Sequence, residues 1–488
     1  MNPRPSSWTD TIVETSVFFL FSLFFYLDYL SLALGLIPRQ FTWLPEVISL
    51  GILFYIFIRL FREKKLIPII SQTQLVIFFI VLTVLGLIIN RVALPVALAG
   101  IRNNLKYLPL FFLPFFFRFD KDFMRKFLLF LFVLALLQLP AAVIQRIVYA
   151  TLWGDVVGGT LGAHSTGILA VFLTLSLACW SFYFLKARLK TGLYILGFFI
   201  LLTPLGLNET KISFFLIPVA FTGVFLFSPD KKRLAKKMLV VFLCFAVGIV
   251  FIGSLYNYMY TWKEEDVTSW VQEREARMKT RIEKQTEMTG KEELDKEEEP
   301  EESQKQGVTE RRPSRYRILE YLQPQRIRNI LYDRKRRQSG TLNRIPQVVF
   351  AFDNIKKDTV HLLFGVGAGN ASDSFFTLAQ GKYYQKHGDM DIGNNLLSRM
   401  LWEYGLIGTT LFFFIFVFLF FKIWRLRKGD GIIGTAASGY LVLIAIFFIT
   451  SIYFNTMLMN LFGYLFWFLG GYMLAYRYHG DDLKETSE

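Results

Sequence analysis

Cysteine is almost absent from this chain: only Cys179 and Cys244 occur among 488 residues, and both lie inside apolar runs. Two such cysteines exclude a disulfide framework and a cysteine-rich metal cluster, and we expect them to be packing residues. We also expect no cleavable signal segment, because the first apolar run is long and aromatic and has no convincing small-residue cleavage site. We expect that run to be retained as a helix.

Long apolar runs dominate the chain instead. Hydrophobic residues make up 53% of it and aromatic residues 17%, including 52 phenylalanines, which is more apolar side chain than a soluble domain buries. We therefore predict an all-α polytopic membrane protein with about twelve spans of roughly 20 residues each. The predicted spans are 13–37, 45–61, 69–89, 92–117, 127–147, 164–185, 191–207, 212–228, 238–256, 397–421, 432–451 and 456–475.

The placement of positive charge predicts the orientation. The net charge is +15, and basic clusters follow every second span. They are Arg59, Arg62, Lys64 and Lys65; Arg118, Lys121, Arg125 and Lys126; Lys186, Arg188 and Lys190; Lys231, Lys232, Arg233, Lys236 and Lys237; and Lys422, Arg425, Arg427 and Lys428. Because lysine and arginine in short loops remain in the cytoplasm, we predict cytoplasmic termini, including a tail at 476–488. The excess of lysine and arginine is then explained by the orientation of the chain in the membrane, and we expect no nucleic-acid partner.

One long polar segment, 257–395, separates spans 1–9 (residues 1–256) from spans 10–12 (residues 396–475) and is predicted to lie outside the cytoplasm. Its part 263–310 is highly charged, and we predict a helix followed by a flexible stretch there. The basic strip 311–337 suits either a helix on anionic lipid headgroups or a platform for a diphosphate or acidic glycan. The part 341–395 is predicted to hold a helix and a glycine-rich turn.

The glycine-rich turn carries Gly365, Gly367 and Gly369. Successive backbone amides in such a turn can bind an anion, and this turn precedes a membrane re-entry where an anionic lipid headgroup lies. A plain turn is the alternative. A dinucleotide site is a poor match, because no βαβ unit surrounds the glycines.

This turn and the start of span ten resemble the bacterial O-antigen ligase and polymerase family. The matching positions are Gly365, Gly367, Asn395, Glu403, Gly405 and Gly408, with Arg344 ahead of the outer helix. Where the ligase pattern has a histidine this chain has Asn394, and Lys211 stands where the family has an arginine between two spans. The resemblance covers the C-terminal half well, and the rest only by span count and topology.

The resemblance implies a glycosyltransferase of the bacterial cytoplasmic membrane, active in O-antigen or exopolysaccharide synthesis. Its donor would be a polyprenyl-diphosphate-linked oligosaccharide. Further partners would be membrane lipids, a glycan flippase, and chain-length or export proteins. Asn394 in place of histidine favours a polymerase of repeat units over a ligase, which stays the alternative. The resemblance also implies roles for Asn394 in catalysis and for Asn395 and Glu403 in substrate binding.

Glycosyl transfer from such a donor needs cations that stabilise the departing diphosphate, and a low-dielectric boundary strengthens their attraction to phosphate. Lys211, Arg344 and Arg102 are the candidates. Arg102 follows a proline-broken apolar run, where an ionisable residue usually faces a bundle interior or a cavity. A snorkelling arginine near a helix break is the alternative reading.

The transfer also needs a base for the acceptor hydroxyl. Glu209 beside Lys211 is the preferred candidate. The alternative is that the two residues form a structural salt bridge. The other candidates are His164, His361, His387, Asp373, Asp389 and Asp391. Asp389 and Asp391 form an Asp-x-Asp that suits either a metal or a solvated loop, and we expect neither a metal nor another cofactor.

Two other classes of function compete with this interpretation. Twelve spans are a common count for carriers, but carriers usually show two similar halves and discontinuous helices near the membrane centre. No halving is visible here, and the segment 257–395 breaks any symmetry. A structural partner of a glycan-export machine, docking through its charged segment, is the third class.

Overall fold

A computed structural model gives the fold. It describes residues 8–33, 36–63, 66–148, 157–162, 165–187, 189–208, 210–228, 234–255, 258, 343–374, 377–390, 392–429, 431–455 and 459–485. Five of the predicted features lie outside these residues: the parts 263–310 and 311–337, and the candidate bases His164, Glu209 and Asp391. The described residues form helices and turns, and no β-strand occurs among them.

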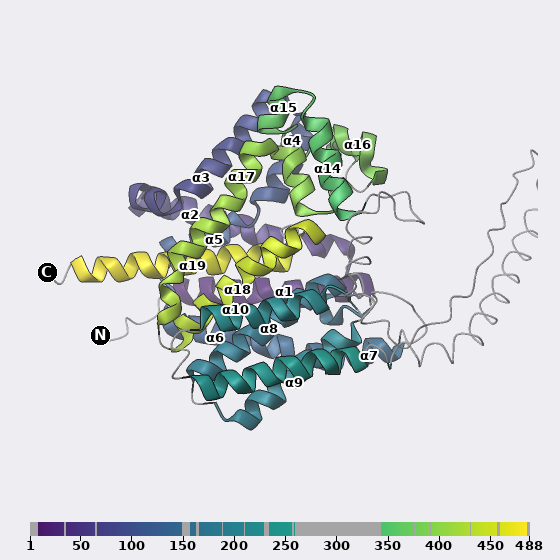
Figure 1. Cartoon of the computed structure of the whole chain (residues 1–488). Helices are drawn as coiled ribbons and strands as arrows, with labels where there is room; N and C mark the ends of the chain where they lie inside the picture. The colour runs from purple at the N-terminus through teal and green to yellow at the C-terminus, as the bar shows by residue number, and fades with distance from the viewer. Residues whose placement is uncertain are drawn as a thin grey trace, which may run out of the picture.

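The helices follow one another with short connections. In chain order they are α1 (Trp8–Asp28), η1 (Tyr29–Ala33), η2 (Arg39–Trp43), α2 (Leu44–Glu63), α3 (Leu66–Ile89), α4 (Leu94–Leu105), α5 (Leu108–Phe116), α6 (Lys121–Leu136), α7 (Gln138–Val148), η3 (Gly159–Leu161), α8 (Thr166–Lys186), α9 (Thr191–Leu207), α10 (Ser213–Phe227), a helix at Ala235–Leu255, α14 (Arg344–Ile355), α15 (Thr359–Phe364), η4 (Thr377–Ala379), α16 (Lys382–His387), η5 (Gly388–Met390), α17 (Leu396–Trp424), η6 (Leu426–Lys428), α18 (Gly431–Tyr453) and α19 (Asn460–Glu485). Most of the long helices lie side by side, and α14, α15 and α16 gather at one end of α17 (Figure 1).

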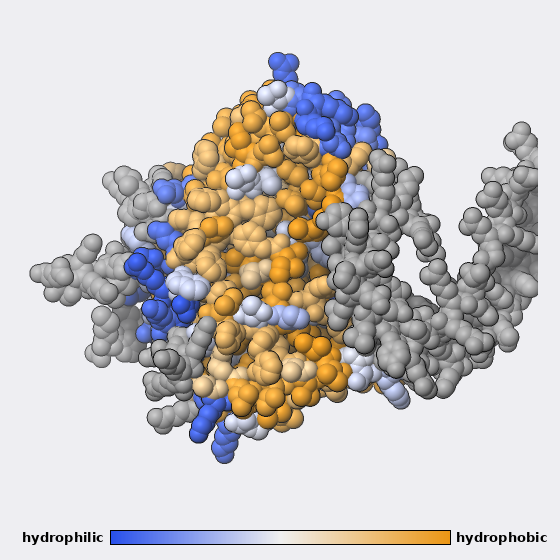
Figure 2. Space-filling view, viewed as in Figure 1, coloured by the Kyte–Doolittle hydropathy of each residue, from blue (hydrophilic) through white to orange (hydrophobic). Residues whose placement is uncertain are grey.

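Among the described residues, seven helices are long and apolar enough to cross a membrane: Thr11–Ser31, Gln40–Arg62, Lys121–Ile147, Thr166–Lys186, Ala235–Leu255, Leu396–Lys428 and Gly431–Tyr453. Shorter apolar helices lie at Thr73–Ile89, Thr191–Leu207 and Ser213–Phe227. The exposed surface of the bundle is apolar around its middle, and hydrophilic residues lie toward its two ends (Figure 2). An all-α protein with several candidate membrane helices is therefore confirmed, whereas the number of twelve spans stays a prediction.

Two predicted spans are broken into helix pairs. The range 92–117 contains α4 and α5, which meet at Lys106 and Tyr107, and the range 127–147 contains most of α6 and all but the end of α7. Pro109 and Pro140 lie in the first turns of the second helices, where a missing amide hydrogen is tolerated. Irregular backbone at membrane depth is stable only where protein or a cavity surrounds it. The break in 92–117 sets Lys106 inside the bundle.

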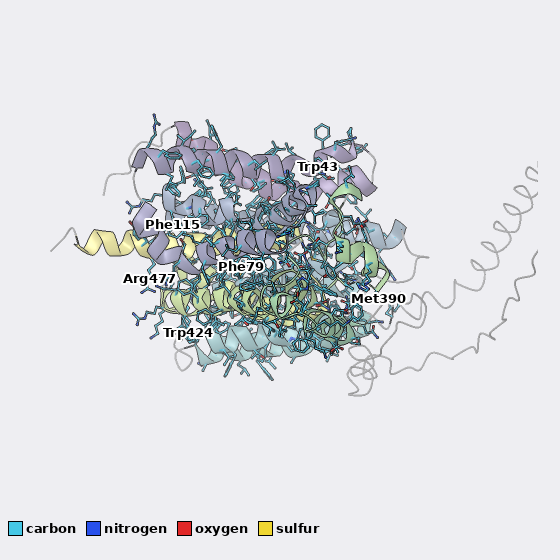
Figure 3. All side chains as sticks on the ribbon, turned by 90° about the horizontal axis from the view of Figure 1, so that it is seen from above. Trp43, Phe79, Phe115, Met390, Trp424 and Arg477 are labelled. Atoms are coloured by element: carbon cyan, nitrogen blue, oxygen red, sulfur yellow. The ribbon has the colours of Figure 1, made fainter. Side chains whose placement is uncertain are left out.

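The bundle has two distinct ends. Trp43 and Met390 lie at one of them, and Phe115, Trp424 and Arg477 lie at the other (Figure 3). We call them the Trp43 end and the Arg477 end. This distribution agrees with the predicted alternation of loops, which assigns the first two residues to one side of the membrane and the other three to the opposite side. Which end faces the cytoplasm stays a prediction.

Helices α5 and α19 pack closely in the middle of the bundle. A Cβ atom at Gly471 of α19 would overlap the carbonyl oxygen of Phe111, and one at Gly463 would overlap the ring of Tyr107. Small residues let helix backbones approach in this way, which strengthens their van der Waals contact in a membrane. These glycines therefore fix the distance between α5 and α19.

Replacing Gly471 with alanine should destabilise the protein by about 1–3 kcal/mol, because the added methyl group forces the two backbones apart. Gly51→Ala is the matched control: Gly51 lies inside α2 with no heavy atom within 4 Å of an added Cβ. Alanine there should be neutral or stabilising, by up to about 1 kcal/mol. Thermal unfolding in detergent, followed by tryptophan fluorescence, separates the two variants. Equal midpoints would contradict the close approach of α5 and α19.

Candidate functional site

The glycine-rich turn follows α15. Gly365, Gly367 and Gly369 all have positive φ angles, of 71°, 89° and 91°, which L side chains rarely adopt. The amide of Gly365 donates to the carbonyl of His361 at 2.8 Å, and that of Gly367 donates to the carbonyl of Glu403 at 3.1 Å. These two amides hold the turn in place, so they are not available for the anion that the sequence-based interpretation assigns to them.

The turn packs against a kink in α17. The kink lies at Gly405, where φ is 62° and ψ is −160°. A Cβ at Gly405 would overlap the backbone of the turn at Gly365, and a Cβ at Gly365 would overlap the backbone of Glu403. The amide of Val366 donates to the carbonyl of Trp402 at 2.7 Å. The two motifs that carry the family resemblance are thus in direct backbone contact.

Helix α4 completes this junction. A Cβ at Gly100 would overlap the backbone of Ala368 in the turn, and a Cβ at Gly369 would overlap the carbonyl oxygen of Val96. The turn is therefore held between α4 and α17. As a result, the last turn of α4, which carries Arg102 and Asn104, lies next to the start of α17.

Glu403 is fully buried at this junction. Ser372 donates its hydroxyl hydrogen to Glu403 Oε1, and Asn104 Nδ2 donates to Oε2 at 3.3 Å. Arg399 Nε lies 3.6 Å from Oε1, which is close enough for an ion pair but too long for a hydrogen bond. The carboxylate that the sequence assigns to substrate binding is therefore occupied by protein groups. In this geometry it holds Ser372, Asn104 and Arg399 in place, and its part in substrate binding stays a prediction.

A small polar cavity lies beside Arg399. Its polar lining residues are Asn103, Asn104, Tyr107, Arg399 and Asn455, and its volume is about 10 Å³, close to that needed for one water molecule. Nε and Nη2 of Arg399 and both side-chain polar atoms of Asn455 are buried without a hydrogen-bond partner in the described part of the chain. Buried donors without acceptors are costly, and an ionisable side chain within a span is a functional-site hypothesis by default.

A second group of charges surrounds Glu46 of α2. Arg102 donates from Nε and Nη2 to the Glu46 carboxylate at 2.5 and 2.7 Å, and Lys106 Nζ donates to it at 3.2 Å. The side chain of Lys106 is 12% exposed and that of Arg102 is 47% exposed. Arg102 also lies 5.8 Å from the ring centroid of Trp43. One carboxylate shared by two cations leaves a net positive charge at the Trp43 end.

Arg344, Asn394 and Asn395 come together where α14 meets α17. Asn395 caps α17 by accepting from the amide of Ser398 at 2.7 Å, and it donates to Gln347 Oε1 at 2.8 Å. The buried Asn395 side chain therefore joins the two helices, while Asn394 beside it is exposed. Arg344 begins α14, and its guanidinium lies 5.2 Å from the ring centroid of Tyr453, the last residue of α18.

Lys211 is exposed and precedes α10. Three residues before Lys211, the side-chain amide of Asn208 donates to the carbonyl of Thr166, the first residue of α8, at 2.9 Å. Phe454 follows Tyr453, whose ring lies beside the guanidinium of Arg344, and it packs against the same first turn of α8. This series of contacts places Lys211 and Arg344 at the same end of the bundle. Glu209, its predicted partner, lies outside the described residues.

Two of the predicted bases, His361 on α15 and His387 on α16, are held by other groups. His361 Nδ1 lies 3.2 Å from the carboxylate of Asp358, and the ring of His387 stacks on Trp402. Burial and the charge of Asp358 raise the pKa of Tyr383, so its hydroxyl remains protonated at neutral pH. None of these contacts directs a base toward the small polar cavity.

A larger cavity of about 360 Å³ lies between α6, α8, α18 and α19. Its lining is apolar apart from a few hydroxyls, Cys179 and one cation, Arg125 at the first turns of α6. None of the predicted site residues is among the described residues that line it. The convergence of charges and polar groups therefore lies at the Trp43 end, away from this cavity.

Sequence reasoning missed five residues of the site: Glu46, Asn104, Lys106, Ser372 and Arg399. A local signal existed for two of them, because Arg399 precedes Glu403 by one helical turn and Lys106 follows Arg102 by the same spacing. The other three, Glu46, Asn104 and Ser372, come from parts of the chain that are distant from one another in sequence. No sequence pattern indicates that they meet.

The motifs of the predicted family thus converge in space. Comparison with protein-family models gives no match for this chain, and comparison with curated proteins gives none either. Membership of the O-antigen ligase and polymerase family therefore stays a prediction, and the function must be inferred from the geometry of the site.

Proposed function

We propose that the protein is a membrane glycosyltransferase that polymerises polyprenyl-diphosphate-linked oligosaccharide repeat units on the outer face of the bacterial cytoplasmic membrane. The observation that carries the proposal is the gathering of cations at the Trp43 end of an apolar bundle. These cations are Arg102, Lys106, Lys211, Arg344 and Arg399. A diphosphate headgroup lies at that level of a membrane, and positive charge at a low-dielectric boundary attracts it strongly.

The reaction explains why cations matter more here than a cofactor. An acceptor oxygen attacks the anomeric carbon of the donor sugar while the bond from that carbon to the diphosphate breaks. The electron pair of that bond leaves on the diphosphate, whose negative charge then increases. Cations fixed in advance lower the energy of this charge as it develops, which accelerates the step.

Two structural features support this function. Lys106 is held inside the bundle by Glu46 of α2, and Arg399 by Glu403 one turn further along α17, so their positions are fixed before a substrate arrives. The direct contact between the glycine-rich turn and the α17 kink joins the motifs of the predicted family at the same place. In this proposal the Trp43 end faces the outside, the Arg477 end faces the cytoplasm, and the bundle has twelve spans.

A strain from which this protein is deleted tests the proposal. Single repeat units on polyprenyl diphosphate should accumulate, because nothing joins them after they reach the outer face. Mass spectrometry of the extracted lipids identifies the accumulated species. Long lipid-linked chains that are not transferred would indicate a ligase instead. A lipid pool identical to that of the parent strain would contradict both activities.

A further inference from the structure

A second cavity at the Trp43 end is lined by parts of α1, η2, η3, α2, α8 and α19. We call it the α1 cavity. Its volume is about 280 Å³, close to the lower end of the range for small-molecule sites, roughly 300–1,000 Å³. Phe24 and Leu161 form apolar walls, and Asp28, Ser165 and Asn460 contribute polar groups. This mixture suits a sugar, which has apolar C–H faces and many hydroxyl groups.

Asp28 is the unusual residue of this cavity. It is exposed and lies three residues before the end of the candidate membrane helix Thr11–Ser31, and an ionisable residue in such a helix is usually functional. It is the last residue of α1, and a rare π-helical turn, of a kind that often marks functional sites, follows it directly. Within the described part of the chain no hydrogen bond or ion pair holds the Asp28 carboxylate, and Asn460 Oδ1 is buried without a partner.

The α1 cavity lies next to the cations. Phe24 of its wall stacks on Tyr464 with ring centroids 4.9 Å apart, and Tyr464 contacts Tyr107 at 4.8 Å. Tyr107 in turn lines the small polar cavity beside Arg399. On another side, Pro45 lines the α1 cavity, and the next residue, Glu46, holds Arg102 and Lys106. The α1 cavity is therefore connected to the cation group through this series of aromatic contacts and through residues 45 and 46 of α2.

We propose that the α1 cavity binds the acceptor sugar and that Asp28 is the general base of the transfer. This inference rests on the proposed function and identifies its acceptor site. The Asp28 carboxylate takes the proton of an acceptor hydroxyl as that oxygen forms its bond to the anomeric carbon. The bond from the anomeric carbon to the diphosphate breaks, and its electron pair leaves on the diphosphate. The proton then passes from Asp28 to solvent.

The test uses the full-length protein, purified and reconstituted in vesicles. The probe is the lipid-linked repeat unit extracted from the deletion strain, and polymer formation is followed by gel analysis of labelled glycan. Asp28→Asn should lower the rate by about 10²–10⁴-fold, as loss of a general base does. Asp28→Glu should retain part of the rate. Asp353→Asn, an exposed carboxylate on α14, is the matched control and should remain as active as the wild type.

The pH profile separates a base from a structural residue. Asp28 is the one titratable group among the described residues that line the cavity. The wild-type rate should fall on the acid side as this carboxylate is protonated, and the residual rate of Asp28→Asn should lack that fall. Ser165→Phe fills the cavity from α8 and should lower both the rate and the binding of the repeat oligosaccharide freed from its lipid.

The outcomes distinguish the two proposals. If the wild type forms no polymer from the lipid-linked repeat unit, the proposed function fails and the acceptor site fails with it. If the wild type is active and Asp28→Asn matches Asp353→Asn, the acceptor site alone is overturned. Should Asp28→Asn not fold, Ser165→Phe decides, because unchanged oligosaccharide binding and polymer formation in that variant overturn the site.

Discussion

Replacing Arg344 with alanine should lower polymer synthesis by about 10²–10³-fold, the effect of removing one group that stabilises charge in a transition state. Arg344 begins α14, and its guanidinium lies 5.2 Å from the ring centroid of Tyr453, which restricts its orientation. Asn395 ties the same turn of α14 to α17 by donating to the carbonyl of Arg344 at 3.1 Å. The charge is therefore fixed at the Trp43 end before substrate binds.

The measurement is polymer yield and chain length in a deletion strain that carries each variant, with expression checked by immunoblot. Arg344→Lys keeps the charge but loses the planar group, so we expect an intermediate yield. Lys356→Ala is the control, because Lys356 is an exposed cation just after the same helix, paired with Asp353 at 2.6 Å. Equal yields from Arg344→Ala and Lys356→Ala would remove Arg344 from the mechanism.

Replacing Glu403 with alanine should cost about 3–5 kcal/mol of folding free energy, because it leaves the guanidinium of Arg399 buried without its carboxylate. Both side chains are inaccessible, with 4% of Arg399 and none of Glu403 exposed. Ser372 and Asn104 also lose their acceptor, and buried donors without partners add to the cost. This is the largest loss of stability that we expect from a single substitution at the site.

A double variant separates the ion pair from general damage to the core. Arg399→Met combined with Glu403→Met removes both charges and keeps apolar volume, so it should be more stable than Glu403→Met or Arg399→Met alone. Denaturant unfolding in detergent gives the free energies. Purely additive losses would show that the two charges do not interact. If the double variant is stable but makes no polymer, this pair of charges is needed for activity as well.

The two classes of variant address different questions about one site. Arg344 is half-buried at the surface of the Trp43 end, so its loss should reduce activity and leave the fold intact. Glu403 lies inside the junction of α4, the glycine-rich turn and α17, so its loss should first reduce stability. A residue whose substitution changes polymer yield without changing the unfolding free energy is therefore a better candidate for contact with substrate.

The sequence by itself determined the class of the fold and the location of most of its helices. A run of about 20 apolar residues can satisfy its backbone hydrogen bonds inside a membrane only as a helix, so hydropathy along the chain reports helices directly. The family motifs also directed attention to Gly365, Asn395 and Glu403, and these residues do converge. Two amides of the turn and the Glu403 carboxylate are engaged with the protein itself, and the roles of these residues in substrate binding stay a prediction.

Only the tertiary structure decided which charges meet. Glu403 contacts Asn104 across 299 positions of sequence, and Glu46 contacts Arg102 across 56. Nor does the sequence predict the α1 cavity, whose walls come from α1, α8 and α19. Local periodicity fixes which face of a helix is apolar, but it does not encode which helix lies opposite. The pairing of Glu46 with Arg102 and Lys106 depends on that choice, because these charges meet only once α2 has packed beside the end of α4.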